Sequence, residues 1–227
     1  VHTFCCAVPG AWHVMGVTLA AGASLQWFRN NLCRDIMQDA AAQGVDPYNL
    51  MDHMAQAVPV GADRLLFLPY LMGERTPHLN PDCRGVFFGL SGMHTRAHMI
   101  RAVMEGVSYS LRDCAGVLRA MGVTSREIVA CGGGGTSPLW RQMLADVLDC
   151  DVCTAASREG PALGVALLAG VGAGIYESVP EACRQVIRIG EPQQANPDAV
   201  KRYGEIYEVY RALYPALKDS YAALAAL

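Results

Sequence analysis

The sequence is 227 residues long, 52% of them hydrophobic and 17% charged, with a formal net charge of −3. This length and composition can bury the core of one large domain, and the charge provides no basic footprint for binding nucleic acid or an anionic membrane. No apolar run reaches membrane-spanning length, and the first residues lack the basic start and cleavage pattern of a signal peptide.

The first 90 residues read as short strands with two helices between them. In chain order they are strands over 1–6 and 13–17, helices over 19–32 and 47–57, and strands over 64–68 and 85–90. A Pro9-Gly10 turn joins the first two strands, and Pro69 stops the apolar run that ends at residue 68. The loop at 72–84, between the last two strands, is rich in Gly, Pro and Asn.

The remainder of the chain reads as helices alternating with strands. In order, these are a helix from about 95 to 120, a strand over 126–130, a helix after the glycine-rich segment 131–137, a strand around 152, and helices over 161–173 and 197–227. The helix after the glycine-rich segment is marked by Leu139, Met143, Leu144, Val147 and Leu148 at helical spacing. Thr95 can cap the helix from about 95 to 120. Its buried face is marked by Ile100, Val103, Met104, Val107, Leu111 and Leu118. Strands followed by helix–strand–helix units indicate an α/β or mixed α+β fold.

Nine cysteines are scattered through apolar surroundings, which is typical of buried, reduced thiols in a cytoplasmic protein. Cys150-x-x-Cys153 invites a redox or metal interpretation, but no second pair lies at zinc-ribbon spacing, which favours ordinary thiols. His94 and His98 can share one helical face. Because no third ligand lies near them in the sequence, we expect both in a solvated first turn of the helix.

The most informative segment is 131–137, CGGGGTS, which lies between a predicted strand and a predicted helix. Glycines allow a tight turn that brings bare N–H groups against a ligand, and a following helix start adds further donors. The segment therefore predicts a phosphate site. A loop that needs small residues only for packing is the alternative, since the spacing is neither that of a P-loop nor G-x-G-x-x-G.

Seven motifs, taken together, resemble the FGGY family of carbohydrate kinases, most closely its xylulokinases, over nearly the whole chain. They are WHVMGV at 12–17, FLPYL at 67–71, GERTPH at 73–78, RGVFFGL at 84–90, RAVMEG at 101–106, the glycine segment with WRQMLAD at 140–146, and GPALG at 160–164. The GERTPH string favours a pentulose kinase over a glycerol kinase.

The resemblance implies an α/β, ribonuclease-H-like domain of the actin and hexokinase type, with a mixed sheet flanked by helices. Residues 1–227 would form the C-terminal nucleotide-binding domain. An N-terminal sugar-binding domain would lie upstream and carry the catalytic-base Asp, so no catalytic residue is expected in this chain.

The reaction implied is the transfer of the γ-phosphoryl group of ATP to D-xylulose, giving D-xylulose 5-phosphate and ADP, with Mg²⁺ bridging the phosphates. Ribulose, gluconate and glycerol are alternative substrates, because the sugar would bind mainly to the N-terminal domain. A non-catalytic nucleotide-binding module is the alternative from another class. A homodimer is compatible with the resemblance.

The resemblance also assigns residues to the nucleotide. Gly22 and Gln26 match positions that touch the ATP phosphates, and four-residue spacing places them on one helical face. The alternative is a packing glycine beside a solvated glutamine.

Within the glycine segment, Gly133 matches the backbone that meets the α-phosphate, flanked by Gly132 and Gly134. Ser137 stands where glycerol kinases place an Asn against adenine. Because serine lacks the paired donor and acceptor of a carboxamide, this contact is open, and a helix N-cap is the alternative.

Glu105 lies on an otherwise apolar helical face, so we expect it to meet a partner inside the fold rather than to act in catalysis. Arg75 and His78 belong to the 73–78 motif, which either faces an interdomain cleft or forms a solvated loop stiffened by Pro77.

Overall fold

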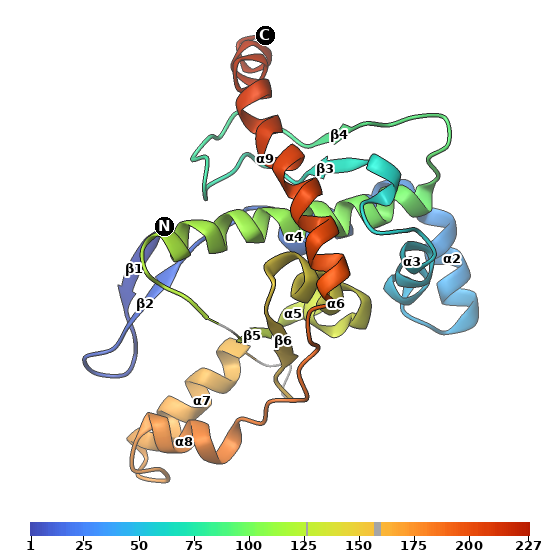
Figure 1. Ribbon diagram of the computed structural model, residues 1–227. Helices are drawn as coiled ribbons and strands as arrows, with labels where there is room; N and C mark the ends of the chain where they lie inside the picture. Colours follow the sequence, from blue (N-terminus) through green and yellow to red (C-terminus); the bar gives the residue numbers. More distant parts are fainter. Residues whose placement is uncertain (126, 157–159) are drawn as a thin grey trace.

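The computed structural model describes residues 1–125, 127–156 and 160–227. The elements are β1 (His2–Cys5), β2 (Trp12–Met15), α1 (Ala21–Leu32), α2 (Arg34–Gln43), α3 (Pro47–Gln56), the 3₁₀ turn η1 (Ala62–Arg64), β3 (Leu66–Leu68), β4 (Val86–Phe88), α4 (Arg96–Ala120), β5 (Glu127–Ala130), α5 (Gly132–Thr136), α6 (Pro138–Leu148), β6 (Asp151–Thr154), α7 (Gly160–Gly172), α8 (Val179–Val186) and α9 (Pro197–Ala225). Figure 1 shows the long helix α4 crossing the middle of the molecule, with the other elements arranged around it.

Helix α4 is the centre of the core. Its predicted apolar face is confirmed at Ile100, Val103 and Met104, which are fully buried. The helix packs against α1, α3, α6 and β3. At Gly106 it comes so close to β3 that any side chain would collide with the carbonyl oxygen of Phe67. Helix α4 is thus the common support of α1, α3 and α6.

The strands pair in three places within the described residues. β1 with β2 and β3 with β4 are antiparallel, and β5 with β6 is parallel, with Ile128 opposite Val152. The predicted α/β class is confirmed, and both kinds of pairing occur, distributed over three two-stranded sheets. The parallel pair positions the glycine segment, because β5 leads directly into it.

Two helices were missing from the sequence prediction, α2 and α8. In α2 only Ile36 and Ala40 are buried, and in α8 only Ala182. One or two small apolar positions give no periodic signal strong enough to predict a helix. Among the described residues, no helix has both the length and the apolar character needed to cross a bilayer.

The prediction that His94 and His98 are solvated was wrong, because both are half-buried against Asp63. The Nδ1 atom of His98 accepts the Thr95 backbone N–H at 3.1 Å, so its Nε2 carries the proton and donates to the Asp63 carboxylate at 3.1 Å. His94 accepts from the Ser91 N–H in the same way and donates to the Asp63 carbonyl oxygen. The pair therefore fastens the start of α4 to η1.

A metal site would need several histidine, cysteine or carboxylate side chains close together. In the part of the chain that the structure describes, no three His, Cys, Asp or Glu side chains lie where they could hold a metal ion. Cys150 and Cys153 are buried free thiols, as predicted, but the expectation of burial was wrong for Cys5 and Cys131, which are exposed.

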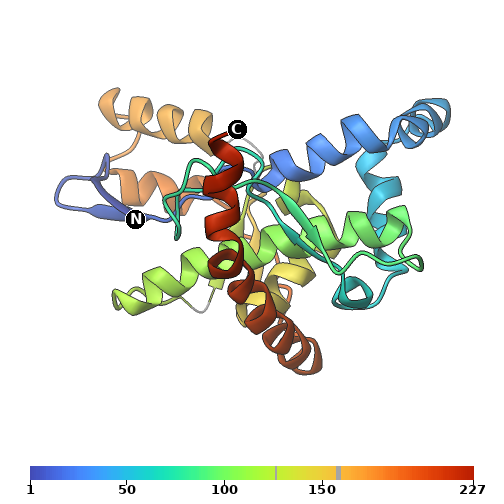
Figure 2. The ribbon, with the colours of Figure 1, turned by 90° about the horizontal axis from the view of Figure 1, so that it is seen from above.

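Helix α9 runs across α4, as Figures 1 and 2 both show. Glu105, only 1% exposed, accepts hydrogen bonds from Arg101 Nε at 2.7 Å and from the Tyr203 hydroxyl and the Gly61 N–H at 3.0 Å. Burial raises the pKa of Glu105, and the Arg101 guanidinium opposes that rise. The prediction of an internal partner for Glu105 is confirmed, and the partners join α4 to α9.

His78 also packs against α9. Its ring stacks on Tyr214 with centroids 3.5 Å apart, and its Nε2 lies 3.1 Å from the Tyr70 hydroxyl. The solvated alternative for the loop therefore fails at His78, which faces the domain interior rather than a cleft. Arg75 is exposed, and its guanidinium lies 2.8 Å from His2 Nε2.

Candidate functional site

A cavity of about 850 Å³ opens between the glycine segment and the helices α1 and α3. Its walls come from the start of α1, the start of α3, residues 130–138 and the residues that follow β6. All six residues predicted to contact a nucleotide line this one cavity: Gly22, Gln26, Gly132, Gly133, Gly134 and Ser137. The structure thus brings together residues that are more than 100 positions apart in the sequence.

The glycine segment begins where β5 ends, at Ala130, and forms a single helical turn, α5, rather than an open turn. Two of its glycines are required by the fold. Gly132 has a φ of +73°, which favours glycine, and a Cβ on Gly135 would lie 2.9 Å from the carbonyl carbon and oxygen of Ala130. Packing against β5 therefore explains part of the glycine content.

Gly133 differs from these two. Its φ lies outside the left-handed region, and a Cβ built on it meets no atom within 4 Å. Gly22, on α1, has the same properties. Both lie in the first turn of their helices, and among the described residues neither a close contact nor the backbone angles require glycine at these positions. What both glycines do is leave the cavity wall without a side chain.

Thr136 and Arg141 hold the α5 turn in shape. The Thr136 hydroxyl donates to the Gly133 carbonyl oxygen at 2.7 Å, and Arg141 Nη1 donates to the carbonyl oxygen of Gly135 at 2.8 Å. Arg141 Nε also donates to Gln193 Oε1 at 2.7 Å. Sequence reasoning gave Arg141 no role beyond its place in a motif. In the structure its guanidinium fixes the glycine turn to the segment before α9.

Ser137 caps α6, which confirms the alternative that the sequence left open. Its hydroxyl oxygen accepts the Trp140 backbone N–H at 3.0 Å, and Pro138 occupies the first position of the helix. A serine that accepts one hydrogen bond still has its own O–H to donate. Ser137 can therefore cap the helix and contact a group in the cavity at the same time.

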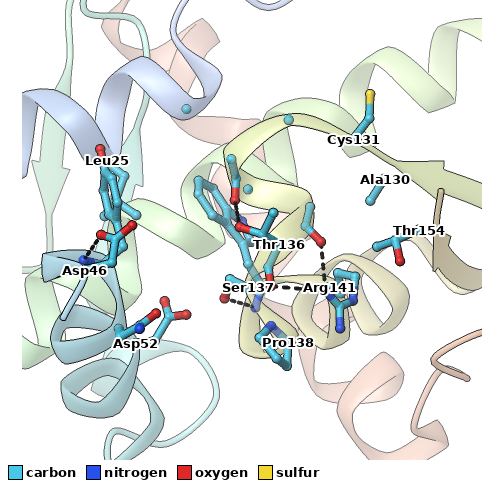
Figure 3. Close-up of a pocket in the computed structure, with 18 of the residues that line it drawn as sticks. Leu25, Asp46, Asp52, Ala130, Cys131, Thr136, Ser137, Pro138, Arg141 and Thr154 are labelled. Atoms are coloured by element: carbon cyan, nitrogen blue, oxygen red, sulfur yellow. Dashed lines mark hydrogen bonds between the residues drawn. The ribbon is translucent and has the colours of Figure 1, made fainter. Parts of the chain in front are cut away.

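The wall opposite the glycine segment comes from α3 and was missed by sequence reasoning. Figure 3 shows Asp46 and Asp52 on one side of the cavity, with Ser137 and Arg141 on the other. Asp46 caps α3 by accepting the Tyr48 N–H at 2.9 Å. Asp52 is half-buried, and burial raises the pKa of its carboxyl, an effect that the neighbouring Ser137 hydroxyl opposes. No local pattern marks these positions, since α3 reads only as a short amphipathic helix.

The cavity therefore has two chemically distinct parts. The turn at Gly132–Thr136 exposes backbone N–H groups, because the first N–H groups of any helix lack intrahelical partners. The α3 wall offers carboxylate oxygens, which are acceptors only when ionised. An elongated molecule with an anionic end and a hydroxyl-bearing end fits this distribution.

Comparison with known proteins finds matches to sugar kinases along nearly the whole chain. The sequence model of the FGGY family of carbohydrate kinases, C-terminal domain, matches residues 1–173. A xylulose kinase of Bacillus subtilis (strain 168) is 37% identical over 224 residues, covering 99% of this chain and 43% of that protein. A gluconokinase of the same strain is 35% identical over 217 residues, covering 94% of this chain and 42% of the relative.

Solved structures agree with the sequence comparison. The ligand-bound xylulose kinase of Lactobacillus acidophilus superposes with a TM-score of 0.79 at 29% identity, over 91% of this chain and 40% of that one. The chain thus spans less than half the length of the curated relatives it matches.

Proposed function

Since the chain belongs to the FGGY family of carbohydrate kinases, as a match to its C-terminal domain, we propose that it forms the nucleotide-binding part of an ATP-dependent sugar kinase. The cavity between α1, α3 and α5 is the proposed ATP site, with the phosphates at Gly22, Gln26 and the 132–134 turn.

The observation that carries the proposal is the bare cavity wall at Gly133 and Gly22. Neither glycine is required by backbone conformation or close packing, and both border the same cavity. A phosphate oxygen needs direct access to backbone N–H groups, which a side chain would obstruct. Access of a phosphate to the backbone therefore explains why glycine stands at these two positions, whereas packing and backbone angles do not.

The rest of the enzyme is proposed from the relatives. Their greater length leaves room for an N-terminal domain that binds the sugar and provides an Asp as general base. That carboxylate would take the proton of the attacking sugar hydroxyl, which bonds to the γ-phosphorus as ADP leaves. Mg²⁺ would arrive bound to the phosphates of ATP, and closure of the two domains would exclude water that otherwise hydrolyses ATP.

D-Xylulose is the proposed substrate, phosphorylated on its 5-hydroxyl. The xylulose kinases among the relatives support it, as does the 73–78 motif. Gluconate is the second candidate, because a gluconokinase matches nearly as well. The sugar would be selected mainly by the proposed N-terminal domain.

The test is a substrate panel on the full-length protein, with coupled detection of ADP. We expect D-xylulose to give the highest kcat/KM, with weaker or no turnover of D-ribulose, gluconate and glycerol. A preference for gluconate would overturn the assignment of xylulose as the substrate but would still support a sugar kinase. ATP binding without turnover of any sugar would favour a non-catalytic nucleotide-binding module. Residues 1–227 alone are expected to phosphorylate none of the four.

A further inference from the structure

Asp52 is a polar side chain on the cavity wall to which the proposed phosphate site gives no role. It projects from α3 beside Ser137 (Figure 3) and is half-buried. In the described part of the chain it belongs to none of the ion pairs. The other carboxylate of this wall, Asp46, is already occupied as the N-cap of its own helix. A carboxylate in a partly closed site needs donors, and the Ser137 hydroxyl supplies one at most.

The order of groups along the cavity indicates which ligand group lies opposite Asp52. If the α-phosphate sits at Gly133, Ser137 lies four positions further along the chain, at the far end of the α5 turn. In a nucleotide, the ribose is the group attached directly to the α-phosphate. The ribose would therefore lie between the glycine turn and the α3 wall.

The chemistry of a carboxylate favours the ribose over the base or the phosphates. Two vicinal hydroxyls are hydrogen-bond donors, which an ionised carboxylate can accept. The Watson–Crick edge of adenine offers one amino group beside an acceptor nitrogen, and phosphate oxygens would be repelled by the negative charge. Acidic side chains serve ribose hydroxyls in the same way at dinucleotide sites.

We propose that Asp52 is a nucleotide-positioning residue whose carboxylate accepts a hydrogen bond from a ribose hydroxyl of bound ATP. The inference rests on the proposed function, since it takes ATP as the ligand of this cavity. With this role, Asp52 on α3 would let the protein distinguish ribonucleotides from deoxyribonucleotides.

The test measures dissociation constants of ATP, 2′-deoxyATP and 3′-deoxyATP by calorimetry, with Mg²⁺, on the full-length protein. Wild type should bind at least one deoxy analogue about tenfold or more weakly than ATP, the effect of one charge-assisted hydrogen bond. In Asp52→Ala that ratio should fall below about twofold, because the hydroxyl then has no partner to lose. Asp52→Asn, which keeps a carbonyl acceptor, should give an intermediate ratio.

Asp39→Ala is the matched control, an exposed carboxylate on α2 outside the cavity. It should leave both the melting temperature and the ratio of ATP to deoxyATP affinity as in wild type. Equal weakening of all three nucleotides in Asp52→Ala would overturn the inference, because it would show a role in shaping the site only. So would a wild type that does not distinguish the three nucleotides. A wild type that binds none of them would overturn the proposed function itself.

Discussion

Replacing Gly133 by valine separates the ligand explanation for this glycine from a packing explanation. A Cβ at this position meets no protein atom within 4 Å, and its φ is outside the left-handed region, so neither a close contact at the Cβ nor the sign of φ opposes a side chain there. The added methyl groups would occupy the space in front of the turn, where the structure has only cavity. We therefore expect thermal stability close to that of wild type, with impaired ATP binding.

The size of the effect depends on what the side chain displaces. If one charge-assisted hydrogen bond from the backbone to a phosphate is lost, about 1.5–3 kcal/mol of binding free energy disappears, or roughly 10- to 150-fold in Kd. Calorimetric titration of the full-length protein with ATP measures this, alongside thermal unfolding.

Two other glycines provide the controls. Gly116 on α4 is exposed, has nothing within 4 Å of a Cβ and lies outside the cavity, so Gly116→Val should change neither property. Gly135→Ala should instead destabilise the fold, since its Cβ would lie 2.9 Å from the Ala130 backbone. Unaltered ATP affinity in a folded Gly133→Val variant would refute the assignment of phosphate to this turn.

Two further predictions concern the interior. Glu105→Ala should cost about 3–5 kcal/mol of unfolding free energy, because it leaves the buried Arg101 guanidinium uncompensated; urea denaturation measures this, and a loss below about 1 kcal/mol would contradict the buried pair. Burial lowers the pKa of His78 to about 4, whereas the unfolded value is about 6.5. The unfolded chain thus binds the proton more readily, so the His78 contribution to stability is complete above about pH 6.5 and is lost as the pH falls toward 4. In His78→Phe, which can still stack on Tyr214, the loss of melting temperature between pH 7 and about pH 4 should be smaller than in wild type; an equal loss in both proteins would show that His78 does not titrate in this way.

Elements with a strong repeating pattern were predictable, and elements stabilised by few or distant contacts were not. The apolar positions of α4 recur at helical spacing, so the helix was predicted, together with its buried residues Ile100, Val103, Met104 and Val107. The polar and small residues that are buried between them, such as Ser108 and Ser110, carry no such signal. The prediction that His94 and His98 share a helical face was correct, but the prediction that they are solvated was wrong. Their partner, Asp63, lies 31 and 35 residues away in the sequence, and no local pattern reports such a distance.

In the candidate site, too, the part that is continuous in sequence was predictable and the part assembled by packing was not. The glycine segment is continuous in sequence, so its chemistry could be proposed from residue types alone. Asp52 lies on the polar side of a short helix, where an aspartate reads as a solvated residue. Only the packing of α3 against α4, with α6 on the same helix, brings Asp52 next to Ser137. The resemblance likewise left Gly22 and Gln26 with two interpretations, and the structure adds that both border the cavity.

The link between Arg141 and Gln193 has a consequence for how the protein matures during synthesis. These two residues are 52 positions apart, so at about 5–20 residues per second roughly 3–10 s pass between their translation. Until Gln193 emerges from the ribosome, the arginine that fastens the glycine turn lacks one of its acceptors. A nascent chain would thus carry every glycine of the cavity before the link between Arg141 and Gln193 could form. Affinity for ATP should consequently appear late in translation, with the arrival of the segment that leads into α9.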